Sequence, residues 1–339
     1  MAPSFGDCFE VLCLQASDGG RGPILFGESL ERTRTLARPF VVGKEFPDTY
    51  LEFPLKGDPF LDVTLLYGKV EPGTRIASDA AAGTGDIFDW YADVRVQHPE
   101  VSFGFELDTK EQELPPAAIH FQPRIHTELV APFCKLAGEP ERADLYLDVC
   151  KRMSETWPLS FFGMFRGRPD SPLRICGYIN DLEERHCAED PDRIQNVFDQ
   201  VGFTAYDSEM LKQVRDLMMV APAGVDFQFD VYPDGTLGDT FAIDARFNLE
   251  QPEAVRASFD QGIASRTIGL FERWGITDDR WSLAVDASFA RSLPVVMDDD
   301  SVRLLAFTLM PQWTKARWRN GVLQPAKLYC LGKASYLDA

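Results

Sequence analysis

The chain has 339 residues, 45% of them hydrophobic and 12% aromatic, and carries a formal net charge of −19 at pH 7. Nucleic acids and anionic membrane surfaces select basic faces, so this charge argues against either partner. No apolar run reaches the ~18 residues of a membrane helix, and residues 1–20 lack the basic-then-apolar pattern of a secretory signal. We therefore expect a cytoplasmic protein. Because no low-complexity linker interrupts the chain, we expect a single domain over residues 1–339.

The cysteines indicate neither a disulfide framework nor a zinc site. Seven cysteines are scattered along the chain, and none stands in CxxC spacing. An odd, scattered set of this kind is typical of free thiols. We expect buried or half-buried thiols.

Two short segments with alternating polar and apolar residues face each other across a turn at five places in the chain. These hairpins are Thr49–Gly68, Ser102–Gln122, Pro158–Ile179, Val225–Phe247 and Val302–Leu331. Their turns contain Lys56-Gly57-Asp58-Pro59, Gly167-Arg168-Pro169-Asp170, Pro233-Asp234-Gly235 and Arg319-Asn320-Gly321. Such sequences favour tight turns, because glycine readily adopts the positive φ that these turns need.

Helical patterns fill most of the gaps between the hairpins. They cover Thr127–Thr156, Pro191–Val220 in two pieces, and Pro252–Trp274. The repeated unit is therefore strand, strand, helix. Five such units predict an α/β (α+β) fold of α-β-β-α repeats, in which a closed antiparallel barrel of ten strands is ringed by helices.

The alternation divides each strand into an apolar face and a polar face. In Val225–Tyr232 the polar face holds Asp226, Gln228, Asp230 and Tyr232. If helices cover the apolar faces and the strands close, the polar faces line the interior, and ten strands leave room for a ligand. An open antiparallel sheet with one solvated face remains the alternative. The same phasing puts further residues on the inner face: Glu52, Asp62, Thr64, Glu106, His120, Gln122, Arg174, Cys176, Tyr178, Thr240, Ala242, Asp244, Arg246, Lys327 and Tyr329.

The repeat order, with Lys327-x-Tyr329 in the last strand and Glu52 in the first, resembles the ABBA family of aromatic prenyltransferases, in its indole or peptide (cyanobactin-like) branch. The resemblance extends roughly from residue 49 to residue 331. Three segments carry it locally: Tyr50-Leu51-Glu52-Phe53, Phe227-Gln228-Phe229-Asp230-Val231-Tyr232-Pro233-Asp234-Gly235 and Pro325-Ala326-Lys327-Leu328-Tyr329. It implies transfer of a dimethylallyl or longer prenyl group from an allylic diphosphate to an electron-rich aromatic acceptor. That acceptor would be an indole or phenol, free or in a peptide.

The resemblance also implies roles for individual residues. Arg174, Arg246 and Lys327 would bind the diphosphate. Tyr178, Tyr232 and Tyr329 would shield the allylic cation, and Glu52 would orient the acceptor and help remove its proton. These residue types suit the chemistry, because a diphosphate needs concentrated positive charge and a carbocation needs aromatic faces without water. Donor chain length would depend on side chains deep in the barrel, with Phe162, Met164, Cys176 and Met310 as candidates.

The inner face carries more carboxylates than a metal-free diphosphate site needs. Asp230 and Asp244 are therefore candidate ligands for Mg²⁺. The same carboxylates could instead pair with the basic residues in the empty site or recognise a basic acceptor. No cofactor is firmly expected, and the involvement of Mg²⁺ stays open.

Two other functions also stay open. A non-catalytic barrel that binds a hydrophobic ligand or peptide would need no basic cluster. A guanidine-modifying enzyme of five-fold repeat fold would use Cys330 and His120, but the alternation puts Cys330 on the apolar face. Helical isoprenoid enzymes are excluded by the number of hairpins, and Asp298-Asp299-Asp300 is expected to be a solvated connection.

Overall fold

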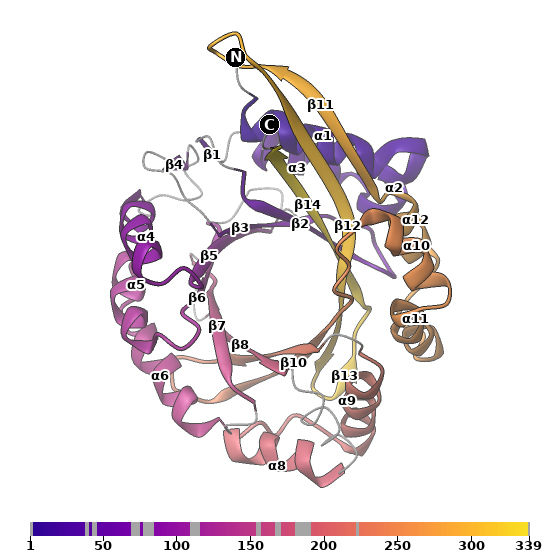
Figure 1. Ribbon diagram of the computed structural model, residues 1–339. Coiled ribbons are helices and arrows are strands. Elements are labelled where there is room, and N and C mark those ends of the chain that lie inside the picture. The colour runs from indigo at the N-terminus through magenta and orange to yellow at the C-terminus, as the bar shows by residue number, and fades with distance from the viewer. Residues whose placement is uncertain are drawn as a thin grey trace.

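The computed structural model describes residues 3–37, 41–42, 46–68, 75–76, 85–108, 116–153, 157–166, 171–179, 191–221 and 224–337. Ten strands form a closed barrel, and helices surround its outer face (Figure 1). The strand order is β2, β3, β5, β6, β7, β8, β9, β10, β12, β14, and the ring closes because β14 pairs with β2. Every pairing is antiparallel. The predicted ten-stranded barrel is therefore confirmed.

The strands are β1 Val41–Val42, β2 Asp48–Pro54, β3 Asp62–Tyr67, β4 Arg75–Ile76, β5 Ser102–Leu107, β6 Ala118–Gln122, β7 Leu159–Met164, β8 Leu173–Ile179, β9 Val225–Val231, β10 Leu237–Arg246, β11 Phe289–Val296, β12 Val302–Arg319, β13 Val322–Leu323 and β14 Lys327–Tyr336. The helices are α1 Phe5–Ser17, α2 Arg21–Phe26, α3 Ser29–Ala37, α4 Gly85–Gln97, α5 Val130–Leu136, α6 Arg142–Arg152, α8 Pro191–Val201, α9 Ser208–Val220, α10 Pro252–Asp260, α11 Ile263–Arg273 and α12 Arg280–Asp286, with 3₁₀ turns η1 Asp18–Gly20 and η3 Thr127–Leu129.

The five predicted hairpins are β2–β3, β5–β6, β7–β8, β9–β10 and the last turn from β12 to β14. Their turn chemistry is as predicted where the structure describes it. Asn320 and Gly321 have φ values of 51° and 72°, and Gly235 has a φ of 82°. Both turns therefore use the left-handed backbone that Asn and Gly tolerate best. The turn predicted at residues 167–170 lies outside the described residues.

The predicted helical segments lie where expected, but the structure divides them into shorter helices. Thr127–Thr156 holds η3, α5 and α6, and its last three residues lie outside the described ranges. Pro252–Trp274 is divided into α10 and α11 at Gln261 and Gly262. The helices α1, α2, α3, α4 and α12 were not predicted. In α1 the signal was readable, because its buried residues Phe5, Cys8, Phe9, Leu12, Cys13 and Ala16 recur with the helical period.

The main core lies between the barrel and the helices. On β9, the outward residues Val225, Phe227 and Phe229 are buried to at least 99%. The ring of Phe229 meets Phe198 of α8 and Phe203 at centroid distances of 5.8 and 5.4 Å. Each fully buried phenylalanine contributes about 1.5–3 kcal/mol through the surface it removes from water. This burial fixes which face of each strand turns outward, and hence which residues line the lumen.

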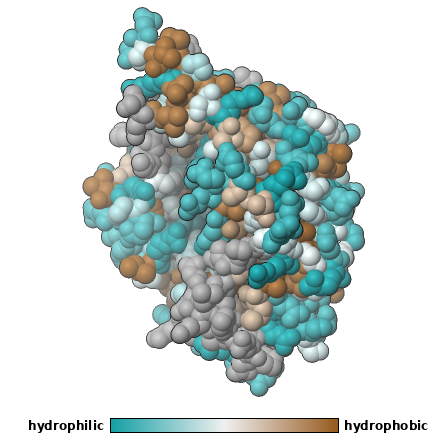
Figure 2. All heavy atoms as spheres, turned by 45° about the vertical axis from the view of Figure 1, so that its right-hand side comes forward, coloured by the Kyte–Doolittle hydropathy of each residue, from teal (hydrophilic) through white to brown (hydrophobic). Residues whose placement is uncertain are grey.

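Strand β12 extends beyond the barrel. Its first half pairs with β11 on one side and β14 on the other, and its second half pairs with β10 inside the ring. The β11–β12 hairpin projects as an arm at the top of Figure 1, and hydrophobic side chains show on it in Figure 2. Strand β11 was not predicted, because its residues are mostly exposed and lack an apolar stripe. Within the described residues, no helix has the length and hydropathy needed to cross a bilayer.

Candidate active site in the barrel lumen

Two adjoining cavities occupy the lumen, with about 800 and 710 Å³ of empty space that is partly open to solvent. They have six lining residues in common: Glu52, Glu106, Arg174, Gln228, Lys315 and Tyr329. They are therefore two halves of one space.

The predicted inner face lines these cavities, with two exceptions. One is Tyr232, which is 40% exposed and borders neither cavity. Its N–H donates to the carbonyl of Thr236 at 2.9 Å, so the chain has already entered the turn after β9. The strand alternation therefore ends at Val231, and assigning Tyr232 to the cation shield was wrong. The other exception is Arg246, at the opposite mouth of the barrel.

The cationic side chains of the lumen gather at one end, here called the basic end, although five carboxylates line it too: Glu52, Asp62, Glu106, Asp108 and Asp230. Four cationic side chains from β8, β12 and β14 line this cavity: Arg174, Lys315, Arg317 and Lys327. Lys315 lies opposite Lys327 on β14 and opposite Asp244 on β10. Sequence reasoning missed Lys315 and Arg317, although the alternation along β12 was a readable signal. Trp313, Lys315 and Arg317 share one face of that strand, while Thr314, Ala316 and Trp318 occupy the buried face.

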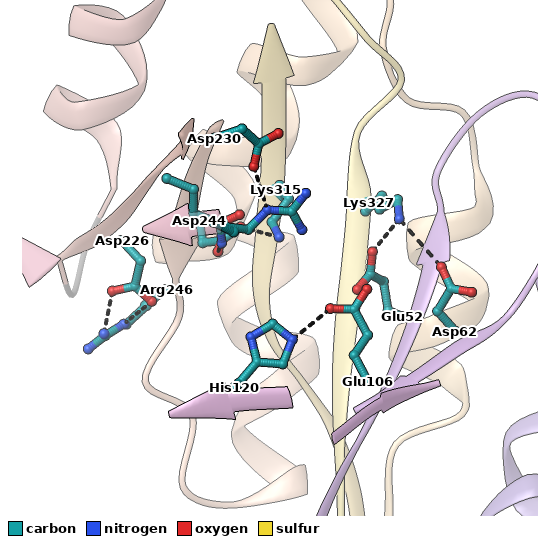
Figure 3. Close-up of polar contacts among 12 residues, drawn as sticks. Glu52, Asp62, Glu106, His120, Asp226, Asp230, Asp244, Arg246, Lys315 and Lys327 are labelled. Carbon is teal, nitrogen blue, oxygen red and sulfur yellow. Dashed lines mark hydrogen bonds and ion pairs between the residues drawn. The ribbon is translucent and has the colours of Figure 1, made fainter. Parts of the chain in front are cut away.

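Lys327 holds two buried carboxylates together (Figure 3). Its Nζ bonds to Glu52 Oε1 and lies 3.6 Å from Asp62 Oδ2. Burial alone would raise the pKa of Glu52, but Lys327 and Lys315 outweigh it, so this pKa lies below its usual value. Burial dominates at Asp62, whose pKa rises to about 8 despite Lys327. At neutral pH, Glu52 is thus the ionised partner of Lys327.

Arg174 and Lys315 are paired with carboxylates as well. Arg174 Nε donates to Asp230 Oδ1 at 3.1 Å, and Lys315 Nζ lies 3.6 Å from Asp244 Oδ1. Asp244 also accepts a hydrogen bond from Gln228 at 2.7 Å through its other oxygen. Its Oδ1 is buried and has no hydrogen bond. Burial raises the pKa of Asp244 to about 6, so this carboxyl titrates close to neutral pH.

A histidine–carboxylate pair faces the same space. His120 Nε2 lies 2.9 Å from Glu106 Oε2, and Figure 3 shows both groups pointing into the lumen from β6 and β5. Although burial favours the neutral acid, the hydrogen bond to His120 and the nearby Arg174 keep the pKa of Glu106 well below its usual range. Sequence reasoning placed both residues on the inner face, but it gave Glu106 no role and gave His120 one only in the guanidine-modifying alternative.

Arg246 belongs to a separate mouth of the barrel. It forms an ion pair with Asp226, with Nε 3.1 Å from Oδ2, and its guanidinium lies 4.2 Å from the ring centroid of Tyr178. The guanidinium of Arg124 approaches the same ring at 4.9 Å. Both arginines line this mouth, and neither borders the basic cavity. The structure therefore does not bring Arg246 together with Arg174 and Lys327.

Aromatic side chains line the half of the lumen next to the basic end. Tyr50, Trp313 and Tyr329 lie in a row across β2, β12 and β14, with centroid distances of 4.6 and 5.2 Å. Lys315 Nζ lies 5.0 Å from the centroid of Tyr329. Tyr178 faces this space from β8 and contacts Phe161 at 5.6 Å. Cationic side chains of the protein already lie against the faces of Tyr329 and Tyr178. Such ring faces also suit a short-lived carbocation.

Several predicted residues have other surroundings. Of the four candidates for donor chain length, only Cys176 lines the lumen. Phe162 packs outward against Phe133 and Tyr146, and Met164 and Met310 are part of the core. These three assignments were wrong, because they lie on the apolar strand faces.

The candidate metal ligands do not meet. Asp230 binds Arg174, whereas Asp244 lies opposite Asp226 on β9 and binds Gln228 and Lys315. Among the residues that the structure describes, no lumenal set of three carboxylate or histidine groups lies close enough to share one ion. The pair Asp230 and Asp244 therefore forms no preformed Mg²⁺ site.

Cys330 cannot serve as a lumenal nucleophile. It is 4% exposed and borders a small space against Leu25 and Phe26 outside the barrel. Burial raises the pKa of its thiol far above the usual value. This placement agrees with the apolar phasing and removes the guanidine-modifying alternative that depended on it.

No protein-family model matches the sequence, and a comparison with curated proteins finds no match either. Solved structures match nearly the whole chain. 5-Dimethylallyltryptophan synthase from Streptomyces coelicolor is 11% identical, with a TM-score of 0.50 over 98% of both chains. Its complex with DMASPP and Trp gives a TM-score of 0.52 at 12% identity, over 98% of this chain and 96% of that one. The apo form of the prenyltransferase PriB gives 0.52 at 11% identity, over 97% and 96%. The chain thus has the ABBA-type prenyltransferase barrel fold.

Proposed function

We propose that this protein is a prenyltransferase that moves a dimethylallyl or longer group from an allylic diphosphate to an electron-rich aromatic acceptor. The observation that carries the proposal is the set of side chains that line the barrel lumen. Basic side chains gather at one end, aromatic rings line the adjoining half, and the buried carboxylate of Glu52 lies between them. A similar fold in 5-dimethylallyltryptophan synthase holds DMASPP and Trp, which supports this choice of substrates.

In this proposal the donor diphosphate binds at the basic end. Arg174, Lys315 and Lys327 come from three different strands and line one cavity, with Arg317 at its more exposed edge. Guanidinium and ammonium groups bind the diphosphate in the ground state and stabilise it as a leaving group. We assign Lys315 the place that the sequence had given to Arg246.

The donor has to compete with lumenal carboxylates for these cations. Lys327 contacts Glu52 and Asp62, Arg174 contacts Asp230, and Lys315 contacts Asp244. When a diphosphate draws Lys327 away, Glu52 loses the partner that lowers its pKa, and burial then raises that pKa. Donor binding thereby converts Glu52 into a stronger base, ready to take a proton from the acceptor.

The aromatic row gives the allylic cation its surroundings. After the C–O bond ionises, the prenyl group lies against Tyr329 and Trp313, whose faces stabilise positive charge. The acceptor enters from the mouth that Tyr50, Tyr178 and Arg246 line, attacks the cation and passes its proton to Glu52. The walls of the barrel limit the access of water, which would otherwise trap the cation.

The first test is thermal unfolding with an unreactive thiolo analogue of dimethylallyl diphosphate, with and without Mg²⁺. Inorganic pyrophosphate is the control. A ligand that binds only the folded protein raises the unfolding midpoint. We expect a larger shift from the analogue than from pyrophosphate, because the analogue also fills the aromatic half. The Mg²⁺ samples measure whether a divalent ion adds to the positive charge of the basic end.

Activity is then assayed by mass spectrometry with dimethylallyl diphosphate and a panel of tryptophan, tyrosine and peptides that contain them. The expected product is an acceptor that carries one added prenyl group. A barrel that only binds a hydrophobic ligand or peptide would yield no product and no shift with the analogue. No shift at millimolar analogue would overturn the proposal in favour of that second function.

A further inference from the structure

A histidine-rich cluster lies on the surface, away from the lumen. His98 follows the end of α4, and His126 lies between β6 and η3. Their ring centroids are 4.1 Å apart. Glu128 belongs to η3, and Glu100 lies in the connection from α4 to β5. Two segments that are separate in sequence therefore bring two imidazoles and two carboxylates together.

Backbone hydrogen bonds hold both histidines in place. His98 N donates to Val94 O at 2.9 Å, at the end of α4. His126 N donates to Pro123 O at 2.9 Å, and the carbonyl of His126 accepts from Leu129 N at 3.1 Å. The helices α4 and α5, next to these segments, lie side by side on the outside of the barrel (Figure 1). The cluster thus stands on ordered backbone.

The side chains have the geometry of a metal site. Ligand atoms of His98, His126 and Glu128 all lie within 4.8 Å of one another, and within the described ranges no other group of this kind occurs. His126 Nδ1 is 3.1 Å from Glu128 Oε1. Two donors bound to one tetrahedral Zn²⁺ at about 2.0–2.1 Å would be about 3.3 Å apart. These two atoms already have nearly that separation.

The second nitrogen of His126 has a partner of its own. Nε2 bonds to the carboxylate of Glu100, so Nδ1 is left to face Glu128 and His98. A metal-binding histidine commonly donates its other ring N–H to a carboxylate, which fixes the ring and makes the metal-bound nitrogen more basic. An ordinary surface ion pair needs only one of the two glutamates. The arrangement of both around His126 fits a metal ligand on Nδ1 and an orienting carboxylate on Nε2.

We propose that His98, His126 and Glu128 bind a divalent transition metal of the Zn²⁺ class, with Glu100 orienting His126. Three protein ligands leave a fourth position for water. The ion cross-links the segment after α4 to the segment after β6. Arg124 precedes His126 by two residues, has a φ of 57° and places its guanidinium at the lumen mouth beside Tyr178. Metal binding therefore restrains the segment that carries a mouth residue.

The test is calorimetric titration of the full chain with Zn²⁺ after treatment with chelator. We expect one ion per chain in the wild type and loss of at least about tenfold in affinity for His98→Ala and His126→Ala. Glu100→Gln should weaken binding by roughly tenfold, the usual effect of removing an orienting carboxylate. His120→Ala is the matched control, because it removes a histidine–glutamate pair that lies elsewhere. Its affinity should equal that of the wild type.

Two further readouts, the thermal unfolding midpoint and the absorption spectrum of bound Co²⁺, also test the proposed metal site. Without metal, His98→Ala should unfold at the same temperature as the wild type, and Zn²⁺ should raise only the wild-type midpoint. Co²⁺ should give a visible spectrum without the charge-transfer band of a thiolate ligand. Undiminished Zn²⁺ binding in His98→Ala and His126→Ala, a thiolate band, or no binding at all would each overturn the proposal. None of these readouts depends on prenyl transfer.

Discussion

Replacing Lys327 by methionine tests the charge balance of the lumen. The substitution keeps a long apolar side chain but removes the ammonium that Glu52 and Asp62 share. These residues are only 4% and 6% exposed, so water replaces the lost partner poorly. Removal of one partner from a buried pair costs about 3–5 kcal/mol. Because Asp62 has a pKa of about 8 and is largely neutral at pH 7, only the Glu52 charge is left unpaired. We therefore expect about 3 kcal/mol, the lower end of that range.

Urea unfolding at pH 7, followed by circular dichroism, measures this loss. With an unfolding entropy of about 0.7 kcal/mol/K for a chain of this length, the thermal midpoint should fall by roughly 4 °C. Adding Glu52→Gln to Lys327→Met should restore at least half of the stability, because the unpaired charge is then gone. Lys333→Met on the same strand is the control. Its pair with Asp48 is partly exposed, at 48% and 38%, and surface pairs contribute about 0–1 kcal/mol. Equal losses for the two lysine variants, or no restoration by Glu52→Gln, would refute the reasoning.

Three further predictions concern pH, turnover and packing. Burial raises the folded-state pKa of Asp244 to about 6, so the folded protein binds this proton more tightly than the unfolded chain, and its contribution to stability falls as pH rises from about 4 to about 7. The free energy gained by Asp244→Asn over the wild type should grow across that range by about 3 kcal/mol, from about 1.4 kcal/mol per pKa unit, and a gain that stays constant with pH would contradict the argument. In the transfer assay, Glu52→Gln should lower kcat by at least about 100-fold without raising KM for the donor, and an unchanged kcat would remove Glu52 from the chemistry. Gly177→Ala should lower stability by more than about 2 kcal/mol in urea unfolding, because its Cβ would lie 2.2 Å from Pro158 O and 2.3 Å from the Phe227 ring. Gly238→Ala, with contacts of 3.3 Å or more, is the matched control, and equal losses at the two glycines would contradict the packing argument.

The sequence contained most of the information on which residues line the lumen. Strand alternation is a local property with a period of two, and a strand with one apolar face can bury only that face. Glu52, Asp62, Glu106, Arg174 and Lys327 were therefore placed on the inner face without knowledge of any contact, and they line the cavities. Where the alternation stopped, as at Tyr232, the prediction failed.

Long-range pairing decided what the sequence could not. That Lys315 lies between Lys327 and Asp244 follows from the register of β12 with β14 and β10. The separation of Arg246 from Arg174 has the same origin. Each residue lies near a different mouth of the barrel, and the position of a residue along its strand decides which mouth it faces.

The surface cluster of His98 and His126 likewise depends on two connections that meet outside the barrel. The face of a strand is set by neighbours in sequence, whereas the meeting of side chains from different strands is set by register and closure. The amino-acid sequence alone thus determined the repeat order and the polar inner face. Only the closed barrel decided which charges meet, because register and closure are properties of the whole ring and not of any one segment.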